Sequence, residues 1–307
     1  MSYEDTMSKV NPYKSGMFQN LFTSYQAFPA LITVTQDSTP RLMIPDKSYQ
    51  QVKNGNGKRL KMVIPSFQRA LAIQLHSHQN DFPALTNALT KVGTFPLGMD
   101  LRDYRGCLDP RISYNESAPD YEVKTALERN MPLFTVCRSF DCSYSFPIPN
   151  YGDYQVMKMA DKMGWDKQQE TWNAQFPWDQ KLSKVYWRGG MKGARVEFLD
   201  RVKTAVKDGN STYLDVKEAG CPKNADPDFC SPKEPLDSSM KYKAVCDIDG
   251  NSWSARFPRL LCYNSAVIKV TLEEDYEEYF MADLQPNVHF IPASLDNFTY
   301  MAEYYMK

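Results

Sequence analysis

The sequence predicts an α/β protein whose sheets are parallel and carry helices on both faces. Short apolar runs alternate with amphipathic segments along most of the 307 residues, and this alternation is typical of such folds. Hydrophobic residues make up 42% of the chain, which is enough for a substantial core and excludes the disordered and fibrous classes.

In the first half, residues 1–30 show no clean periodicity and are expected to form an arm. Two apolar runs around a turn-like segment that ends at Pro40 predict a hairpin. Apolar residues at helical spacing predict helices, and short apolar runs that end in polar loops predict strands. The expected elements are hairpin strands 31–34 and 41–44, helices 66–76 and 81–92, and strands 94–99 and 131–136.

The second half repeats the alternation and ends in a helix rich in Tyr and Met. Residues 220–238 contain many Pro, Asp, Ser and Cys residues and are expected to form a loop. The other expected elements are a helix or crossover at 161–174, helices 195–206, 255–262 and 297–307, and strands 184–187, 242–248, 266–270 and 287–292.

Two halves of about 150 residues predict two Rossmann-like domains with a cleft between them. We place the domains at 1–165 and 166–294, and the C-terminal helix, 295–307, can pack back on the first domain. Ligands of open α/β sheets bind beyond the carboxyl ends of the strands. The loops that follow strands are therefore the candidate sites.

Charge and cysteine content exclude several classes. The net charge is −1 without a long basic run, which argues against nucleic-acid binding, and none of the seven cysteines forms a C-x-x-C zinc pair. The N-terminus lacks the features of a secretory signal, and no apolar run is long enough to span a membrane. We therefore expect a cytoplasmic protein with free thiols, in which Cys221 and Cys230 can pair only in an oxidising compartment.

The first candidate loop, 100–104, follows a predicted strand and contains Asp103. A carboxylate in this position can act as a general base or can cap the next helix. The second candidate loop follows the strand that ends at Arg188. Gly189 and Gly190 would let backbone N–H groups approach a phosphate that Arg188 binds, although such a pair also forms ordinary turns.

The third candidate loop, 247–259, leads from a strand into a helix. Ser254 and Arg256 at the start of that helix suit a diphosphate. Pro258 fits only in a first helical turn, so the helix is expected to begin near Ala255 or to be kinked. The pair Asp247 and Asp249 offers an alternative, because paired acids hold a metal in some sugar-nucleotide enzymes.

These loops lie in motifs that resemble glycosyltransferase family 90, which contains the Rumi-type protein O-glucosyltransferases and the capsule-associated xylosyltransferases. The resemblance is strongest over 241–292. Four segments resemble the family's KYKY, (D/R)G, ASFR and LL motifs, namely 241–243, 249–250, 254–257 and 260–261. Three further segments resemble EFFYPxLKPxVHYIP (278–292), YFRG (186–189) and VRDYP (101–104). The chain departs from the family pattern at Arg105, Pro258 and Asn264.

The resemblance implies a GT-B fold and an inverting transfer from a UDP-sugar without a metal or another cofactor. Asp103 would be the general base, with 1–165 on the acceptor side and 166–294 on the donor side. The implied acceptor- or sugar-binding residues are Arg102, Tyr104, Asn264 and Ser265. The implied donor-binding residues are Arg188, Gly189, Arg195, Tyr242, Asp249, Gly250, Asn251, Ser252, Ser254 and Arg256.

The implied partners are a UDP-sugar and a glycan or glycoprotein acceptor. Xylose is favoured over glucose, because the family members that build capsules and glycans use it. Two alternatives stay open. One is a protein that binds UDP or a glycan through a decayed catalytic site, and the other is a metal-dependent sugar-nucleotide enzyme that uses Asp247 and Asp249.

Overall fold

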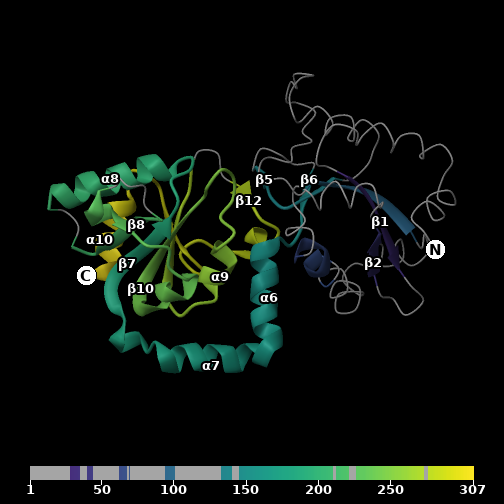
Figure 1. Cartoon of the computed structure of the whole chain (residues 1–307), viewed down its shortest axis with the longest axis horizontal. Coiled ribbons are helices and arrows are strands. Elements are labelled where there is room, and N and C mark those ends of the chain that lie inside the picture. Colours follow the sequence, from purple (N-terminus) through teal and green to yellow (C-terminus); the bar gives the residue numbers. More distant parts are fainter. Residues whose placement is uncertain are drawn as a thin grey trace, which may run out of the picture. The chain divides into compact units, whose positions relative to one another are not determined.

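Figure 1 presents the computed structural model of the chain, which describes residues 28–34, 40–43, 62–67, 69, 94–100, 133–139, 145–209, 212–220, 226–272 and 276–307. Contacts between Cα atoms divide the chain into two units. The first unit contains Met1–Tyr154 and Tyr276–Tyr279, and the second contains Gln155–Asp275 and Phe280–Lys307. The domain limits expected at residues 165 and 294 remain predictions.

A mixed sheet with the order β2-β1-β3-β4-β6 forms the described core of the first unit. Its strands are β1 (Phe28–Val34), β2 (Pro40–Met43), β3 (Thr94–Asp100), β4 (Leu133–Thr135) and β6 (Ser145–Pro147). The predicted hairpin is confirmed, since β1 and β2 pair antiparallel. The prediction of parallel sheets is wrong here, because β1 also runs antiparallel to β3, and only β3, β4 and β6 are parallel.

Four residues from late in the sequence complete the first unit. Strand β12 (Tyr276–Glu277) pairs antiparallel with β5 (Arg138–Ser139), and the guanidinium of Arg138 lies 2.6 Å from the carboxylate of Glu277. The buried side chain of Asn150 donates to Glu278 at 2.5 Å. Its backbone N–H donates to Asp153 in the first turn of α6 (Tyr151–Met163).

The second unit contains a six-stranded sheet in which all neighbouring strands are parallel. Its order is β13-β11-β10-β7-β8-β9, which is 6-5-4-1-2-3 when the strands are counted along the chain. This is the strand order of the dinucleotide-binding folds. The strands are β7 (Leu182–Gly189), β8 (Leu214–Ala219), β9 (Cys230–Ser231), β10 (Tyr242–Ile248), β11 (Ala266–Val270) and β13 (Ile291–Ala293).

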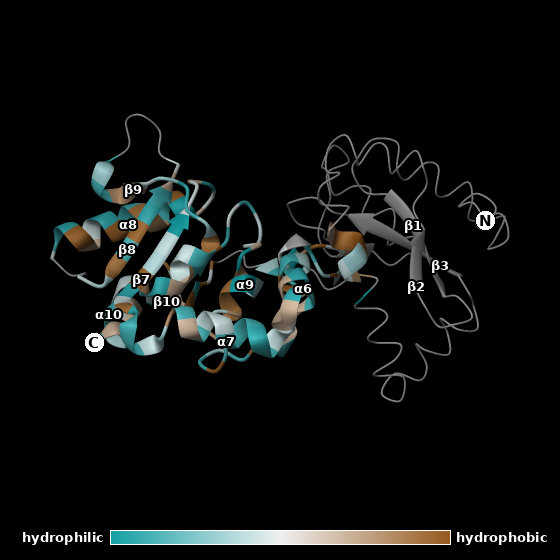
Figure 2. Ribbon diagram, turned by 60° about the horizontal axis from the view of Figure 1, so that its bottom comes forward, coloured by the Kyte–Doolittle hydropathy of each residue, from teal (hydrophilic) through white to brown (hydrophobic). Residues whose placement is uncertain are grey.

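Helices cover both faces of this sheet and form two hydrophobic clusters. On one face, α8 (Arg195–Lys207) and α10 (Phe298–Met306) pack on β7, β8 and β10, with Phe198 against Phe298. On the other face lie α7 (Trp165–Gln175) and α9 (Phe257–Leu261). Figure 2 shows the alternating hydrophilic and hydrophobic residues of α8, as expected of a helix that covers a sheet.

The sequence predictions for the second unit mostly agree with the structure. Strands 242–248 and 266–270 coincide with β10 and β11, and α8 and α10 begin within one residue of their predicted starts. Helix α9 begins at Phe257, with Pro258 in its first turn. Strand β8 was not predicted. The loop expected at 220–238 contains short elements, namely η2 (Pro227–Phe229), β9 and the start of η3 (Leu236–Lys241).

Two observations bear on the expected location of the protein. No helix in the described ranges combines the length and the apolar character that crossing a bilayer requires. Cys230 is disulfide-bonded, whereas Cys137, Cys246 and Cys262 are free thiols. The expectation of free thiols therefore fails at Cys230, for which pairing with Cys221 was expected only in an oxidising compartment. Disulfides are rare in the cytosol, so this bond weighs against the cytoplasmic location, which stays a prediction.

Candidate functional site

The candidate site lies at the carboxyl ends of β7 and β10, the adjacent strands where the order of the sheet reverses. The chain leaves β7 toward α8 on one face and leaves β10 toward α9 on the other. A crevice opens at such a switch point, and ligands of open α/β sheets bind there. Two loops border it, 190–194 and 249–256, and the second contains most of the predicted donor-binding residues.

Glycine allows these two loops to meet. Gly193 has a positive φ of 55°, and a Cβ atom on it would lie 2.5 Å from the carbonyl oxygen of Gly250. A Cβ on Gly250 would lie 3.4 Å from the guanidinium of Arg195. Any side chain at Gly193 would therefore push the loops apart. Gly193 was not among the predicted site residues, although it completes a Gly-Gly-x-x-Gly run after a strand.

Arg195 borders this crevice, and no hydrogen bond or ion pair joins its guanidinium to a described carboxylate, while the charges of Asp247 and Asp249 act on it through space. Its Nε donates to the carbonyl of Asp249 at 3.0 Å, and its Nη2 donates to the carbonyl of Ile248 at 2.9 Å. Burial, and next the positive charge of Arg256, lower the pKa of the guanidinium to about 10. A partly buried cation whose described hydrogen-bond acceptors are all neutral carbonyls is well placed to bind an anion.

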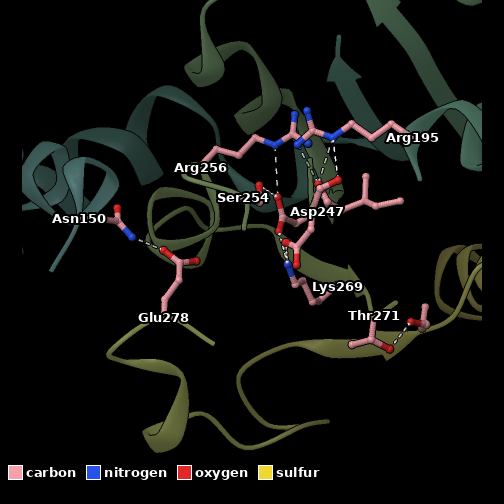
Figure 3. A network of polar contacts seen from close by, with 11 residues as sticks. Asn150, Arg195, Asp247, Ser254, Arg256, Lys269, Thr271 and Glu278 are labelled. Atoms are coloured by element: carbon pink, nitrogen blue, oxygen red, sulfur yellow. Dashed lines mark hydrogen bonds and ion pairs between the residues drawn. The ribbon is translucent and has the colours of Figure 1, made fainter. Parts of the chain in front are cut away.

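Arg256 lies beside Arg195, and Figure 3 shows the two guanidinium groups side by side. Nε of Arg256 donates to Asp247 at 3.2 Å, and Nη1 donates to the carbonyl of Arg188 at 2.5 Å. Its Nη2 is buried and has no hydrogen-bond partner in the described part of the chain. Two adjacent like charges repel each other, and an anion between them would relieve this repulsion and satisfy the free N–H groups.

A buried ionic network fixes the loop that carries Arg256. Asp247 is fully buried and accepts hydrogen bonds from Ser254 Oγ at 2.5 Å and Lys269 Nζ at 2.9 Å, in addition to Arg256. Lys269 Nζ also lies 2.5 Å from Asp249. Burial alone would raise the pKa of Asp247, but Lys269 and Arg256 together hold it below its usual value.

Lys269 bears on whether Asp247 and Asp249 can bind a metal ion. Its ammonium group contacts both Asp247 and Asp249, so it occupies the place that a divalent cation would need between them. Within the described residues, no cluster of three or more His, Cys, Asp or Glu side chains could hold a metal ion. Lys269 was not among the predicted site residues, although a lysine inside the apolar strand β11 requires a buried partner.

Arg188 points to the face of the sheet that carries η3. Its guanidinium pairs with Asp215 at 2.8 Å and lies 4.5 Å from the ring centre of Tyr186. The hydroxyl of Tyr242 donates to the same carboxylate at 2.6 Å. Arg188 and Arg256 nevertheless line one cavity of about 90 Å³, which also has Glu234 and Ser239 in its wall.

Three predicted residues lie at the opposite edge of the sheet, and the first of them, Tyr242, begins β10 there. Asn264 and Ser265 precede β11, and Lys181, directly before β7, donates to the carbonyl of Asn264 and to Ser265 Oγ. In a parallel sheet the amino ends of the strands share one edge, so these residues are separated from the crevice by the length of the strands. Burial lowers the pKa of Lys181 to about 8.

Some of the remaining predicted residues lie in the loop after β10, and others lie outside the described residues. Ser252 and Ser254 are buried in the loop after β10, and Asn251 is exposed there. Arg102, Asp103 and Tyr104 lie outside the described residues. The structure thus brings Arg195, Gly250, Ser254 and Arg256 together, with Arg188 and Gly189 beside them, and leaves the predicted general base untested.

Comparison with known proteins finds a family and a curated relative that this chain resembles. The model of Glycosyl transferase family 90 matches residues 110–303, which is more than half of the chain and begins after Asp103. Protein O-glucosyltransferase 2 of Danio rerio is 29% identical over 200 residues. The match covers 61% of this chain and 37% of that protein, so the chain spans little more than a third of the relative's length.

Proposed function

The chain belongs to glycosyltransferase family 90, and we propose that it transfers a sugar from a UDP-sugar to a hydroxyl group of a glycan or a protein. The observation that carries this proposal is the pair of guanidinium groups of Arg195 and Arg256 at the switch point of the parallel sheet. Together they offer a diphosphate two positive charges and unused N–H groups.

The proposed mechanism uses these charges where negative charge develops. When the bond between the sugar and UDP breaks, the leaving diphosphate gains charge, and fixed cations stabilise it without reorganisation. Arg195 and Arg256 fill this role, and Ser254 and Lys269 hold Arg256 through Asp247. Asp103 would take the proton of the acceptor hydroxyl. This assignment rests on the resemblance of 101–104 to the family motif.

The proposal also specifies the stereochemistry, the metal requirement and the donor sugar. The transfer is inverting and proceeds in a GT-B arrangement, as the family resemblance implies. It needs no divalent metal, and the contact of Lys269 with both Asp247 and Asp249 supports this. The donor sugar is glucose or xylose. The name of the Danio rerio relative supports glucose as the first sugar to test, whereas the sequence analysis favoured xylose.

The test is the release of UDP from a panel of UDP-sugars, with and without EDTA, accompanied by direct titration with UDP. We expect slow hydrolysis of one donor at the same rate in EDTA. Arg256→Ala should weaken UDP binding by roughly 1.5–3 kcal/mol, the range for hydrogen bonds to charged groups. The control is Arg201→Ala, which removes an exposed arginine on α8 that pairs with Glu197 and Asp296.

Each result has a clear meaning. Loss of hydrolysis in EDTA would contradict the metal-free mechanism and return attention to Asp247 and Asp249. Tight UDP binding without turnover of any donor, with acceptors present, would favour a binding protein. If UDP does not bind, or binds equally well to Arg256→Ala, the diphosphate site proposed here is wrong.

A further inference from the structure

Glu218 is a half-buried acid beside the candidate site, and its carboxylate is unpaired within the described structure. It is the next-to-last residue of β8 and pairs in register with Gly189 at the end of β7. Its backbone carbonyl accepts from Ser231, but no hydrogen bond or ion pair joins its carboxylate to any described residue. In contrast, Asp215 and Asp247 are paired.

Strand alternation places Glu218 on the side of the sheet that faces α8. Leu214 and Val216 belong to the hydrophobic cluster under α8, and side chains two residues apart along a strand share a face. Glu218 continues this row at the carboxyl end, where the cluster ends. Its carboxylate therefore lies on the side of the sheet from which the loop 190–194 leads into α8.

The position of Glu218 fits one end of a nucleoside diphosphate. Arg256 donates to the carbonyl of Arg188, the residue before Gly189, so the diphosphate-binding group lies at the end of β7. Glu218 is on the next strand, about 5 Å away across the sheet. A carboxylate repels phosphate but accepts hydrogen bonds from hydroxyl groups, so it should face the ribose rather than the diphosphate.

The order of the strands supports the same assignment. β7 and β8 are the first and second strands of the parallel sheet. In folds with this order, an acid that follows the glycine-rich turn by roughly 20 residues binds the ribose hydroxyl groups of the nucleotide. Glu218 follows the run that ends at Gly193 at a similar separation and lies at the carboxyl end of the second strand.

We propose that Glu218 accepts hydrogen bonds from the ribose 2′- and 3′-hydroxyl groups of the donor nucleotide and makes the site selective for ribonucleotides. This inference rests on the proposed function, since it assumes that a nucleoside diphosphate binds between Arg195 and Arg256. It also orients the nucleotide in that site, with the diphosphate toward β10 and the nucleoside toward β8.

The experiment compares UDP with 2′-deoxy-UDP and 3′-deoxy-UDP in binding titrations against the full chain, Glu218→Ala and Glu218→Gln. Glu170→Ala is the control, because Glu170 is an exposed acid on α7. We expect the wild-type chain to bind UDP at least about tenfold more tightly than one of the deoxy analogues, as for a hydrogen bond to a charged group. Glu218→Ala should reduce this ratio to about one, whereas Glu170→Ala should retain it.

The ratio is measured on a single protein sample, so a general loss of folded protein cannot produce it. An unchanged ratio in both Glu218 variants would overturn the proposal, and so would a wild-type chain that does not distinguish UDP from its deoxy analogues. Failure of the wild-type chain to bind any of the three nucleotides would instead refute the proposed function on which this inference rests.

Discussion

Replacing Lys269 with Met should sharply destabilise the second unit. The ammonium group of Lys269 contacts two carboxylates, those of Asp247 and Asp249, which are 0% and 2% exposed. Met fills a similar volume, so the change removes charge and leaves little cavity. Among the described residues, Arg256 then remains as the ion-pair partner of Asp247, and Asp249 loses its contact with the ammonium group. Removing one partner of a buried ion pair costs about 3–5 kcal/mol, and we expect a loss in this range at neutral pH.

Urea unfolding at pH 7 measures this loss, with Lys184→Met as the control because Lys184 is exposed on β7 of the same sheet. Adding Asp249→Asn to Lys269→Met should recover part of the stability, since Arg256 can then neutralise Asp247 alone. UDP affinity should fall in Lys269→Met as Ser254 and Arg256 lose their anchor. A loss below about 1 kcal/mol, or an equal loss in Lys184→Met, would refute the reasoning.

Two further predictions concern glycine and pH. Gly193→Ala should reduce both stability and UDP affinity, because its Cβ would lie 2.5 Å from the carbonyl oxygen of Gly250. The control is Gly209→Ala, since Gly209 has a positive φ of 74° but open space around it, and this variant should lose only about 1–2 kcal/mol of stability. Equal losses of stability in urea unfolding would exclude the loop contact as the cause. Burial raises the pKa of Asp153 from 3.8 to about 7, so the folded chain retains a proton that the unfolded chain releases, and stability should fall by up to about 1.4 kcal/mol per unit as the pH rises from about 4 to 7. Asp153→Asn should flatten this slope, and an unchanged slope would place the proton elsewhere.

The elements of the second unit were predictable where an apolar run is continuous. Strands β10 and β11 match their predicted limits because both are buried along most of their length. Strand β8 escaped prediction because only Val216 in it is fully buried, so the apolar pattern is too weak to detect. The parallel sheet expected for the first half failed at β1, whose antiparallel pairing with β3 depends on residues far away in the sequence.

The candidate site was only partly predictable, because sequence motifs do not reveal which edge of a sheet a residue occupies. Arg256 and Ser254 follow β10 and lie at the carboxyl edge, whereas Asn264 and Ser265 precede β11 and lie at the amino edge. Whether a motif follows or precedes its strand in the sequence indicates which edge of the sheet it occupies. The role of Lys269 needed the structure, since its partners are 20 and 22 residues away.

The return of 276–279 to the first unit affects how the chain can fold during synthesis. Asn150 and Glu278, whose side chains bond to each other, are 128 residues apart in the sequence. The larger part of the second unit, Gln155–Asp275, is therefore synthesised before the first unit can form its last contacts. Such a distant contact slows folding, because a long loop must close first. The first unit should consequently stay incomplete until then, and a fragment that stops before Tyr276 would lack part of its own fold.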